Sequence, residues 1–171
     1  LCGRGLFLYN ASEAHPETNY LGIELNFKEG RRSAKRLQKR EADNARVLGG
    51  DAITALRNHM QPHTVHAVHV YFPDPWWKKR HKRRRIMNET FVGALQSTLS
   101  PEGRLHFWTD VAEYFEVAIQ LITERTELIG PLRVPPRTAE HDMDYRTHFE
   151  RRVRLHGQTV YRAEFQKANH W

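Results

Sequence analysis

The chain of 171 residues carries 27 lysines and arginines against 20 aspartates and glutamates, which gives a formal net charge of +7 and an isoelectric point near 9.8. This length supports one hydrophobic core and is short for two ordinary domains, so we predict a single domain over residues 1–171. The excess of basic residues predicts an anionic partner, with nucleic acid as the first candidate and a membrane surface as the second. No apolar stretch approaches the roughly 20 residues that span a bilayer, so a membrane-spanning helix is not expected.

A glycine loop opens the chain, because Gly3-Arg4-Gly5 precedes an apolar stretch that reads as a helix ending near His15. Strand and helix patterns then alternate. The expected strands are 20–25, 45–48, 65–72 and 104–108, and the expected helices are 28–40, 51–59, 84–99 and 111–125. This alternation predicts a mostly parallel sheet with helices on both faces.

The pattern changes after Gly130. A Pro135-Pro136 linker and an acidic-polar stretch from Glu140 to Asp144 lead to a short helix over 147–155 and a last strand over 159–165. Because the connection between these two elements is short, we predict that the last strand returns antiparallel at the sheet edge.

The most informative segment runs from Tyr71 to Arg85. Pro73 and Pro75 fix the backbone on both sides of Asp74, and two tryptophans follow, so we predict a preset carboxylate beside aromatic rings, suited to a flat base. The seven lysines and arginines from Lys78 to Arg85 predict contact with phosphate. Taken alone, the charge run is typical of a solvated surface or a localisation signal, and Pro-Asp-Pro of a turn. Their adjacency after an apolar strand favours a functional site.

Two further acids lie at or just after the ends of predicted strands. Glu24 lies about twenty residues after the glycine loop, where nucleotide-binding folds place the acid that binds ribose hydroxyls. Asp51 follows Gly49-Gly50 and fits either a position beside an adenine ring or the N-cap of the next helix.

Two pairs have the spacing of helix caps. Asp110 with Glu113, and Thr147 with Glu150, are three residues apart, so sequence chemistry alone leaves structural and functional roles open.

No metal site is expected. The histidines at positions 63, 66 and 69 recur every third residue in an apparent strand, which puts successive side chains on opposite faces. The single cysteine, Cys2, is expected to be a small loop residue and not a nucleophile. A single cysteine cannot form an internal disulfide, which agrees with a cytoplasmic protein.

The central segment resembles a family signature. Phe72-Pro73-Asp74-Pro75-Trp76, then Lys78-Lys79-Arg80-His81 and Arg83-Arg84-Arg85, is similar to the signature of the tRNA (guanine-N(7)-)-methyltransferases. Further matches, in the family's order, are Gly22-Ile23-Glu24, Gly50-Asp51-Ala52, Thr109-Asp110 and Thr147-His148-Phe149-Glu150. The resemblance implies a Rossmann-like class I methyltransferase with a seven-stranded sheet, S-adenosyl-L-methionine as cofactor and tRNA as partner.

The resemblance also implies residue roles. The implied cofactor-binding residues are Gly3, Gly5, Glu24, Asp51 and Asp74. Asp74 is the implied catalytic residue, between cofactor and base. The implied substrate-binding residues are Lys78, Arg80, His81, Asp110, Thr147 and Glu150.

Three positions depart from the family pattern. Leu1 stands where the first loop glycine is expected, Trp77 where proline is usual, and Glu102 replaces the first glycine of a Pro-Gly-Gly turn. Because the chain begins at Leu1, without a methionine and within this motif, a first strand and an amino-terminal extension are expected ahead of it.

The expected reaction is methyl transfer to N(7) of a guanine in tRNA, in the variable loop by the same resemblance. Two alternatives stay open: methylation of an exocyclic amine, and a catalytically silent RNA-binding module that has lost its cofactor. Both a monomer and a homodimer are compatible with the sequence.

Overall fold

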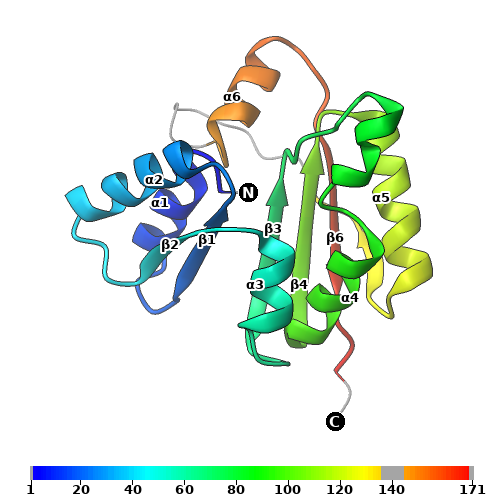
Figure 1. Cartoon of the computed structure of the whole chain (residues 1–171), viewed down its shortest axis with the longest axis horizontal. Coiled ribbons are helices and arrows are strands. Elements are labelled where there is room, and N and C mark those ends of the chain that lie inside the picture. The colour runs from blue at the N-terminus through cyan, green and yellow to red at the C-terminus, as the bar shows by residue number, and fades with distance from the viewer. Residues whose placement is uncertain (1, 136–144, 170–171) are drawn as a thin grey trace. The chain divides into compact units, whose positions relative to one another are not determined.

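The computed structural model describes residues 2–135 and 145–169 and divides into two compact units. Unit 1 comprises Leu1–Ala52 and Arg137–Gly157, and unit 2 comprises Ile53–Pro136 and Gln158–Trp171. The chain therefore leaves unit 1, builds most of unit 2, returns to unit 1 and ends in unit 2 (Figure 1). Leu1, Pro136 and the stretch from Glu140 to Asp144 lie outside the described residues. None of the described helices is long and apolar enough to cross a bilayer.

Unit 1 contains two parallel strands, β1 (Tyr20–Glu24) and β2 (Ala45–Gly49), with Tyr20 opposite Ala45 and Glu24 opposite Gly49. Helices α1 (Leu6–Ala14) and α2 (Phe27–Lys39) pack on this pair, and α6 (His148–Leu155) belongs to the same unit. The buried core joins Leu8 of α1, Leu37 of α2 and Ala45 of β2. Asn26 starts α2, because its side chain accepts hydrogen bonds from the backbone N–H groups of residues 28 and 29.

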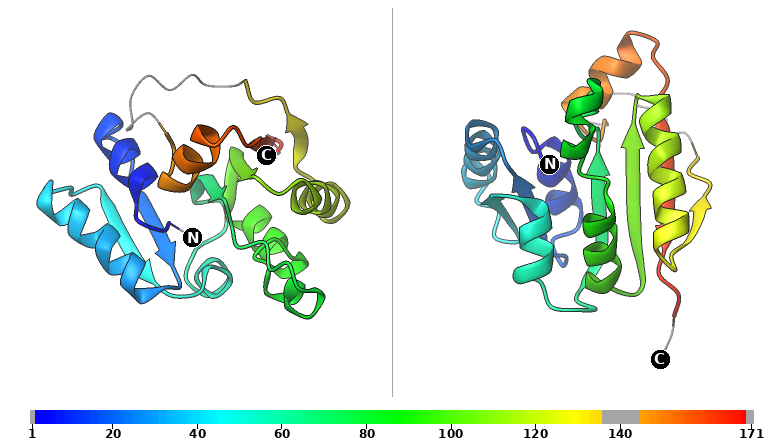
Figure 2. Two further views of the ribbon diagram at one scale, coloured as in Figure 1. Left: turned by 90° about the horizontal axis from the view of Figure 1, so that it is seen from above. Right: turned by 45° about the vertical axis from the view of Figure 1, so that its right-hand side comes forward.

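Unit 2 contains a four-stranded sheet in the order β3-β4-β6-β5. The strands are β3 (Val65–Tyr71), β4 (Leu99–Thr109), β5 (Ile129–Leu132) and β6 (Tyr161–Gln166). β3 and β4 are parallel and lie side by side (Figure 2, right), whereas β6 is antiparallel to both β4 and β5. The sheet of unit 2 is therefore mixed.

Three helices accompany these strands: α3 (Ala52–Asn58), α4 (Glu89–Thr98) and α5 (Ala112–Arg125). The core of unit 2 is formed by apolar and aromatic side chains from α4, α5, β4 and β6. Its fully buried members include Val92, Leu95, Leu105, Phe107, Tyr114, Ile122 and Phe165. Phe107 and Tyr114 meet edge to face, with ring centroids 5.9 Å apart, so α5 is held against β4.

The predicted alternation of strands and helices is confirmed, and two details are wrong. The helix expected from Arg84 begins at Glu89, because Asn88 caps it by accepting from the Phe91 N–H, and residues 79–84 form a short 3-10 helix instead. The last strand is antiparallel, as predicted, but it does not lie at the edge, because β5 pairs on its outer side. Among the described residues the structure has six strands in two sheets.

β4 contains a sharp irregularity at Glu102-Gly103. Glu102 adopts φ of 61°, the left-handed region that favours glycine. A Cβ on Gly103 would lie 2.8 Å from the Ser100 carbonyl oxygen, which explains why glycine is required there. The departure at Glu102 therefore introduces backbone strain that a glycine would avoid.

Candidate functional site

The first group of predicted residues surrounds the end of β1 in unit 1. Glu24 is 5% exposed, and its carboxylate accepts from the N–H of Gly3 (2.9 Å) and from the N–H of Asn26 (2.8 Å). The Glu24 carbonyl accepts from the N–H of Gly50 (3.0 Å). One acid therefore ties together the glycine loop, the start of α2 and the end of β2, and Asp51 follows directly.

The glycines of this group differ in what surrounds them. A Cβ on Gly3, Gly49 or Gly50 would meet no atom within 4 Å, so the backbone there faces open space. Gly5 is different, since its Cβ would lie 2.0 Å from Ser33 Oγ of α2 and its φ is 72°. Gly5 thus allows close packing of the loop on α2, and the other three leave room for a ligand.

The second group lies on the turn after β3 in unit 2. Phe72 and Trp76 adopt φ of 49° and 47°, conformations that bulky side chains rarely take. Between them Pro73 is buried and Asp74 is exposed. Such strain persists only where the surrounding structure holds it, and it is concentrated at functional sites. The Asp74 carboxylate thus projects to solvent from a fixed backbone.

Arg85 anchors this turn through its buried side chain. Its guanidinium is buried, donates from Nε to the Pro75 carbonyl (2.6 Å) and from Nη2 to Glu113 Oε2 (2.8 Å), and lies 4.4 Å over the Tyr114 ring. Lys82 also donates to Glu113 (2.7 Å). The bonds from Arg85 and Lys82 lower the pKa of Glu113 from 4.5 to about 2. Arg85, expected to hold phosphate, is instead an internal support of the turn.

The remainder of the basic run faces solvent. Lys78 and Arg80 are exposed and His81 is half-buried, with its ring edge-on to Trp76 at 5.9 Å. The Arg84 guanidinium lies over the Trp76 ring, 5.1 Å from its centroid, and Trp77 is 67% exposed. Cationic and aromatic side chains therefore alternate next to Asp74, a combination that suits stacked bases and phosphates.

Of the two roles left open for Asp110 and Glu113, the structure does not show the capping role. α5 begins after Val111 without a side-chain cap, and the Glu113 carboxylate instead accepts hydrogen bonds from Arg85 and Lys82. The bond near this helix start comes from Thr109, whose buried hydroxyl accepts from the Val111 N–H (3.2 Å). Asp110 is half-buried directly after β4.

For Thr147 and Glu150, in unit 1, the structure shows one of the two bonds of a capping box. Thr147 Oγ1 accepts from the Glu150 N–H (2.9 Å), whereas the Glu150 carboxylate accepts from the backbone N–H of Arg146 and not from that of Thr147. Glu150 is 2% exposed and also accepts from Arg154 (3.3 Å). Its carboxylate therefore stabilises the start of α6.

Cys2 has the properties of a loop residue. Its backbone N–H donates to the Ile23 carbonyl (3.0 Å), which ties the loop to β1. Burial, with a further contribution from Glu24, raises the pKa of the Cys2 thiol, so the nucleophilic thiolate is disfavoured.

The predicted residues thus form three groups, one around Glu24, one on the Asp74 turn and one at the start of α6, and Asp110 lies by itself after β4. Sequence reasoning missed Asn26, and it did not predict that Arg85 and Glu113 anchor the turn. An asparagine just before a helix was a usable signal for Asn26. No comparable signal separated Arg85 from its six basic neighbours, because burial is decided by tertiary packing.

Comparison with known proteins gives a consistent result. Residues 1–163 match the family described as "Putative methyltransferase". A tRNA (guanine-N(7)-)-methyltransferase from Rhodopirellula baltica is 45% identical, over 96% of this chain and 63% of that protein. One from Alkalilimnicola ehrlichii is 34% identical, over 98% of this chain and 70% of that protein. The chain thus spans about two thirds of the length of these relatives.

Solved structures share the fold. The aminoglycoside resistance methyltransferase NpmB1 superposes with a TM-score of 0.60 at 16% identity, over 98% of this chain and 84% of that one. The precorrin-6y C5,15-methyltransferase of Geobacter metallireducens gives 0.58 at 16% identity, over 75% of this chain and 61% of that one. Both support a Rossmann-like α/β fold of the class I methyltransferase type.

Proposed function

Because this chain belongs to the tRNA (guanine-N(7)-)-methyltransferase family, we propose that it transfers the methyl group of S-adenosyl-L-methionine to N(7) of a guanine in tRNA. We also propose that the two units act as one methyltransferase domain and that the complete sheet has seven strands. A tRNA substrate and a chain with a single cysteine agree with a cytoplasmic enzyme. The variable loop of tRNA is the proposed target region.

The end of β1 fits the cofactor. An ionised carboxylate has about four acceptor positions, and Glu24 uses two of them for the Gly3 and Asn26 N–H groups. The remaining positions can accept hydrogen bonds from the ribose hydroxyls of the cofactor. The open space at Gly3, Gly49 and Gly50 leaves room for the rest of the cofactor, including its adenine base. Asp51 is proposed to complete this binding surface, and Gly5 to contribute indirectly, by packing the glycine loop on α2. When bound, S-adenosyl-L-methionine supplies an electrophilic methyl group.

The observation that carries the proposal is the rigid presentation of Asp74. N(7) of neutral guanine has a free lone pair, so the protein needs no general base and its main task is alignment. Asp74 is proposed to accept hydrogen bonds from the guanine edge and to stabilise the positive charge that develops on the purine. A carboxylate fixed by two prolines and anchored through Arg85 performs this task without reorganisation.

The surrounding residues are proposed to bind RNA. The exposed cations Lys78 and Arg80, with His81, hold phosphates, and Trp76 or Trp77 stacks on the base that leaves its tertiary stacking. Asp110, Thr147 and Glu150 are the other proposed substrate residues. For Thr147 the capping bond gives the side chain a defined orientation while leaving a hydroxyl lone pair available.

The test is transfer of labelled methyl from S-adenosyl-L-methionine to unmodified tRNA by the full-length protein, followed by nucleoside analysis. Label in N(7)-methylguanosine, which carries a fixed positive charge, is the expected result. Label in an uncharged exocyclic-amine product would identify the other reaction. Retained tRNA binding without label, and without cofactor affinity in calorimetry, would identify a silent RNA-binding module.

The role of Asp74 is tested in the same assay. We expect Asp74→Ala to reduce kcat by about 10²–10³-fold or more, as for loss of a preorganised electrostatic group, with tRNA affinity nearly unchanged. Asp43→Ala removes another exposed aspartate and should leave both quantities unchanged. Retained turnover in Asp74→Ala would remove this residue from the mechanism.

A further inference from the structure

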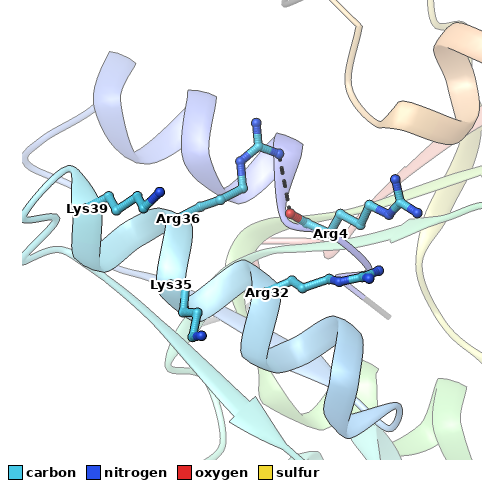
Figure 3. Close-up of a pocket in the computed structure, with 5 residues that line it drawn as sticks. All are labelled: Arg4, Arg32, Lys35, Arg36 and Lys39. Atoms are coloured by element: carbon cyan, nitrogen blue, oxygen red, sulfur yellow. Dashed lines mark hydrogen bonds between the residues drawn. The ribbon is translucent and has the colours of Figure 1, made fainter.

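Unit 1 carries a hollow lined entirely by cations. The hollow has a volume of about 410 Å³, and its lining residues are Arg4, Arg32, Lys35, Arg36 and Lys39. Four of them come from α2, and Arg4 comes from the glycine loop (Figure 3). We call these five residues the α2 cationic face. None of them belongs to the basic run after β3.

The fold does not require this concentration of charge. The α2 members follow the spacing i, i+3, i+4 and i+7, which puts them on one side of the helix, whereas Ser33 and Leu37 are buried. Like charges four residues apart, such as Lys35 and Lys39, destabilise a helix. The face therefore exists at a cost to the stability of α2.

Little negative charge offsets this face within unit 1. Glu29 pairs with Arg4 (3.4 Å) and with Arg32 (2.8 Å). Arg36 instead contacts His148 Nε2 (2.9 Å), and partial burial together with the Arg36 charge lowers the pKa of His148, which favours the neutral ring. Among the described residues, Lys35 and Lys39 have no carboxylate partner.

The arrangement suits a chain of phosphates better than a single one. From Arg32 to Lys39 the helix rises about 10 Å, so one phosphate group cannot reach all four α2 cations. A second hollow of about 430 Å³ continues past Arg32 and Lys35 to Arg31, Lys28 and Phe27. Phe27 is 75% exposed, and an exposed aromatic ring beside cations is suited to an unpaired base.

We propose that the α2 cationic face binds the phosphate backbone of the substrate tRNA, as a second RNA contact separate from the basic run after β3. This inference rests on the proposed function, because it takes tRNA as the polyanion. The face contributes binding and orientation and takes no part in methyl transfer.

The test is the double variant Lys35→Gln/Lys39→Gln of the full-length protein, with unmodified tRNA and fluorescence anisotropy over a range of salt concentrations. Loss of two phosphate contacts should weaken binding about 10-fold near 0.15 M salt and reduce the slope of log K against log salt by roughly 1.4–1.8. In methylation assays KM for tRNA should rise while kcat stays unchanged. The melting temperature should stay the same or rise, because like-charge repulsion is removed.

The matched control is Arg57→Gln/Arg125→Gln, which removes two cations from α3 and α5. An equal loss of affinity in this control would mean that net charge alone acts, and would overturn the proposal. An unchanged affinity and salt slope in Lys35→Gln/Lys39→Gln would also overturn it. So would lost binding to phosphatidylserine vesicles with unchanged tRNA binding, because the face would then be a lipid surface. If the wild-type protein neither binds nor methylates tRNA, the proposed function itself fails.

Discussion

Replacing Arg85 should damage both stability and catalysis, because this buried side chain holds the turn that carries Asp74. Arg85→Ala removes a bond of 2.6 Å to the Pro75 carbonyl, a bond of 2.8 Å to Glu113 and a cation–π contact at 4.4 Å. Charge-assisted hydrogen bonds contribute about 1.5–3 kcal/mol each and a desolvated cation–π contact up to about 2 kcal/mol. Because Glu113 is half-exposed, the low end applies and we expect a loss of about 3 kcal/mol.

Such a loss corresponds to a melting temperature about 6–12 °C lower for a chain of this size. Below that temperature kcat should fall about 10²-fold, since a misplacement of about 1 Å at a reacting group has this effect. Arg85→Lys keeps the charge but lacks the planar fork, so it should recover only part of both losses. Calorimetry and single-turnover kinetics give the two quantities.

The matched control is Arg83→Ala, an exposed residue of the same run, with an expected stability change within about 0.5 kcal/mol. If Arg85→Ala melts early but keeps wild-type kcat in the folded state, the anchor does not position Asp74. If neither quantity changes, the buried contacts contribute nothing and the reasoning is refuted.

Three other substitutions test separate parts of the structure. Because the pKa of Glu113 is lowered to about 2, its carboxylate stabilises the fold fully above about pH 4.5 and loses this effect as pH falls toward 2. The stability difference between wild type and Glu113→Gln in urea denaturation should therefore shrink from pH 5 to pH 2, and a constant difference would contradict the ion pair. Gly5→Ala should lower the melting temperature more than Gly3→Ala, because only the former meets Ser33; equal effects would disprove the close packing. Glu102→Gly should raise the free energy of unfolding by about 0.5–1 kcal/mol by relieving left-handed strain, and a decrease would show that the Glu102 side chain matters more than its φ.

The order of strands and helices could be predicted because each element carries its own periodicity and boundary residues. The strand that sequence reasoning missed, β5, has only four residues and includes Gly130 and Pro131. Ile129 is its one residue that favours a strand, and its structure comes from pairing with β6, where Ile129 lies opposite Gln166. An element defined by a distant partner is not visible in a local pattern.

In the site, too, local patterns could be predicted and features that depend on tertiary packing could not. Glu24 was predicted from its distance to the glycine loop, and the structure adds that the two are hydrogen-bonded. Asp74 was predicted from its flanking prolines. The strained backbone of Phe72 and Trp76 and the anchor Arg85 were not predictable, because both depend on packing between β3, the turn and α5.

The insertion of β6 between β4 and β5 has a consequence for biosynthesis. Leu132 and Gln166 are 34 positions apart, so at 5–20 residues per second the ribosome needs about 2–7 s to deliver β6 after β5. During this interval β5 has no strand partner among the described residues, and β4 presents an open hydrogen-bonding edge on the side away from β3. A translational pause in this window would prolong the exposure of that edge to other nascent chains.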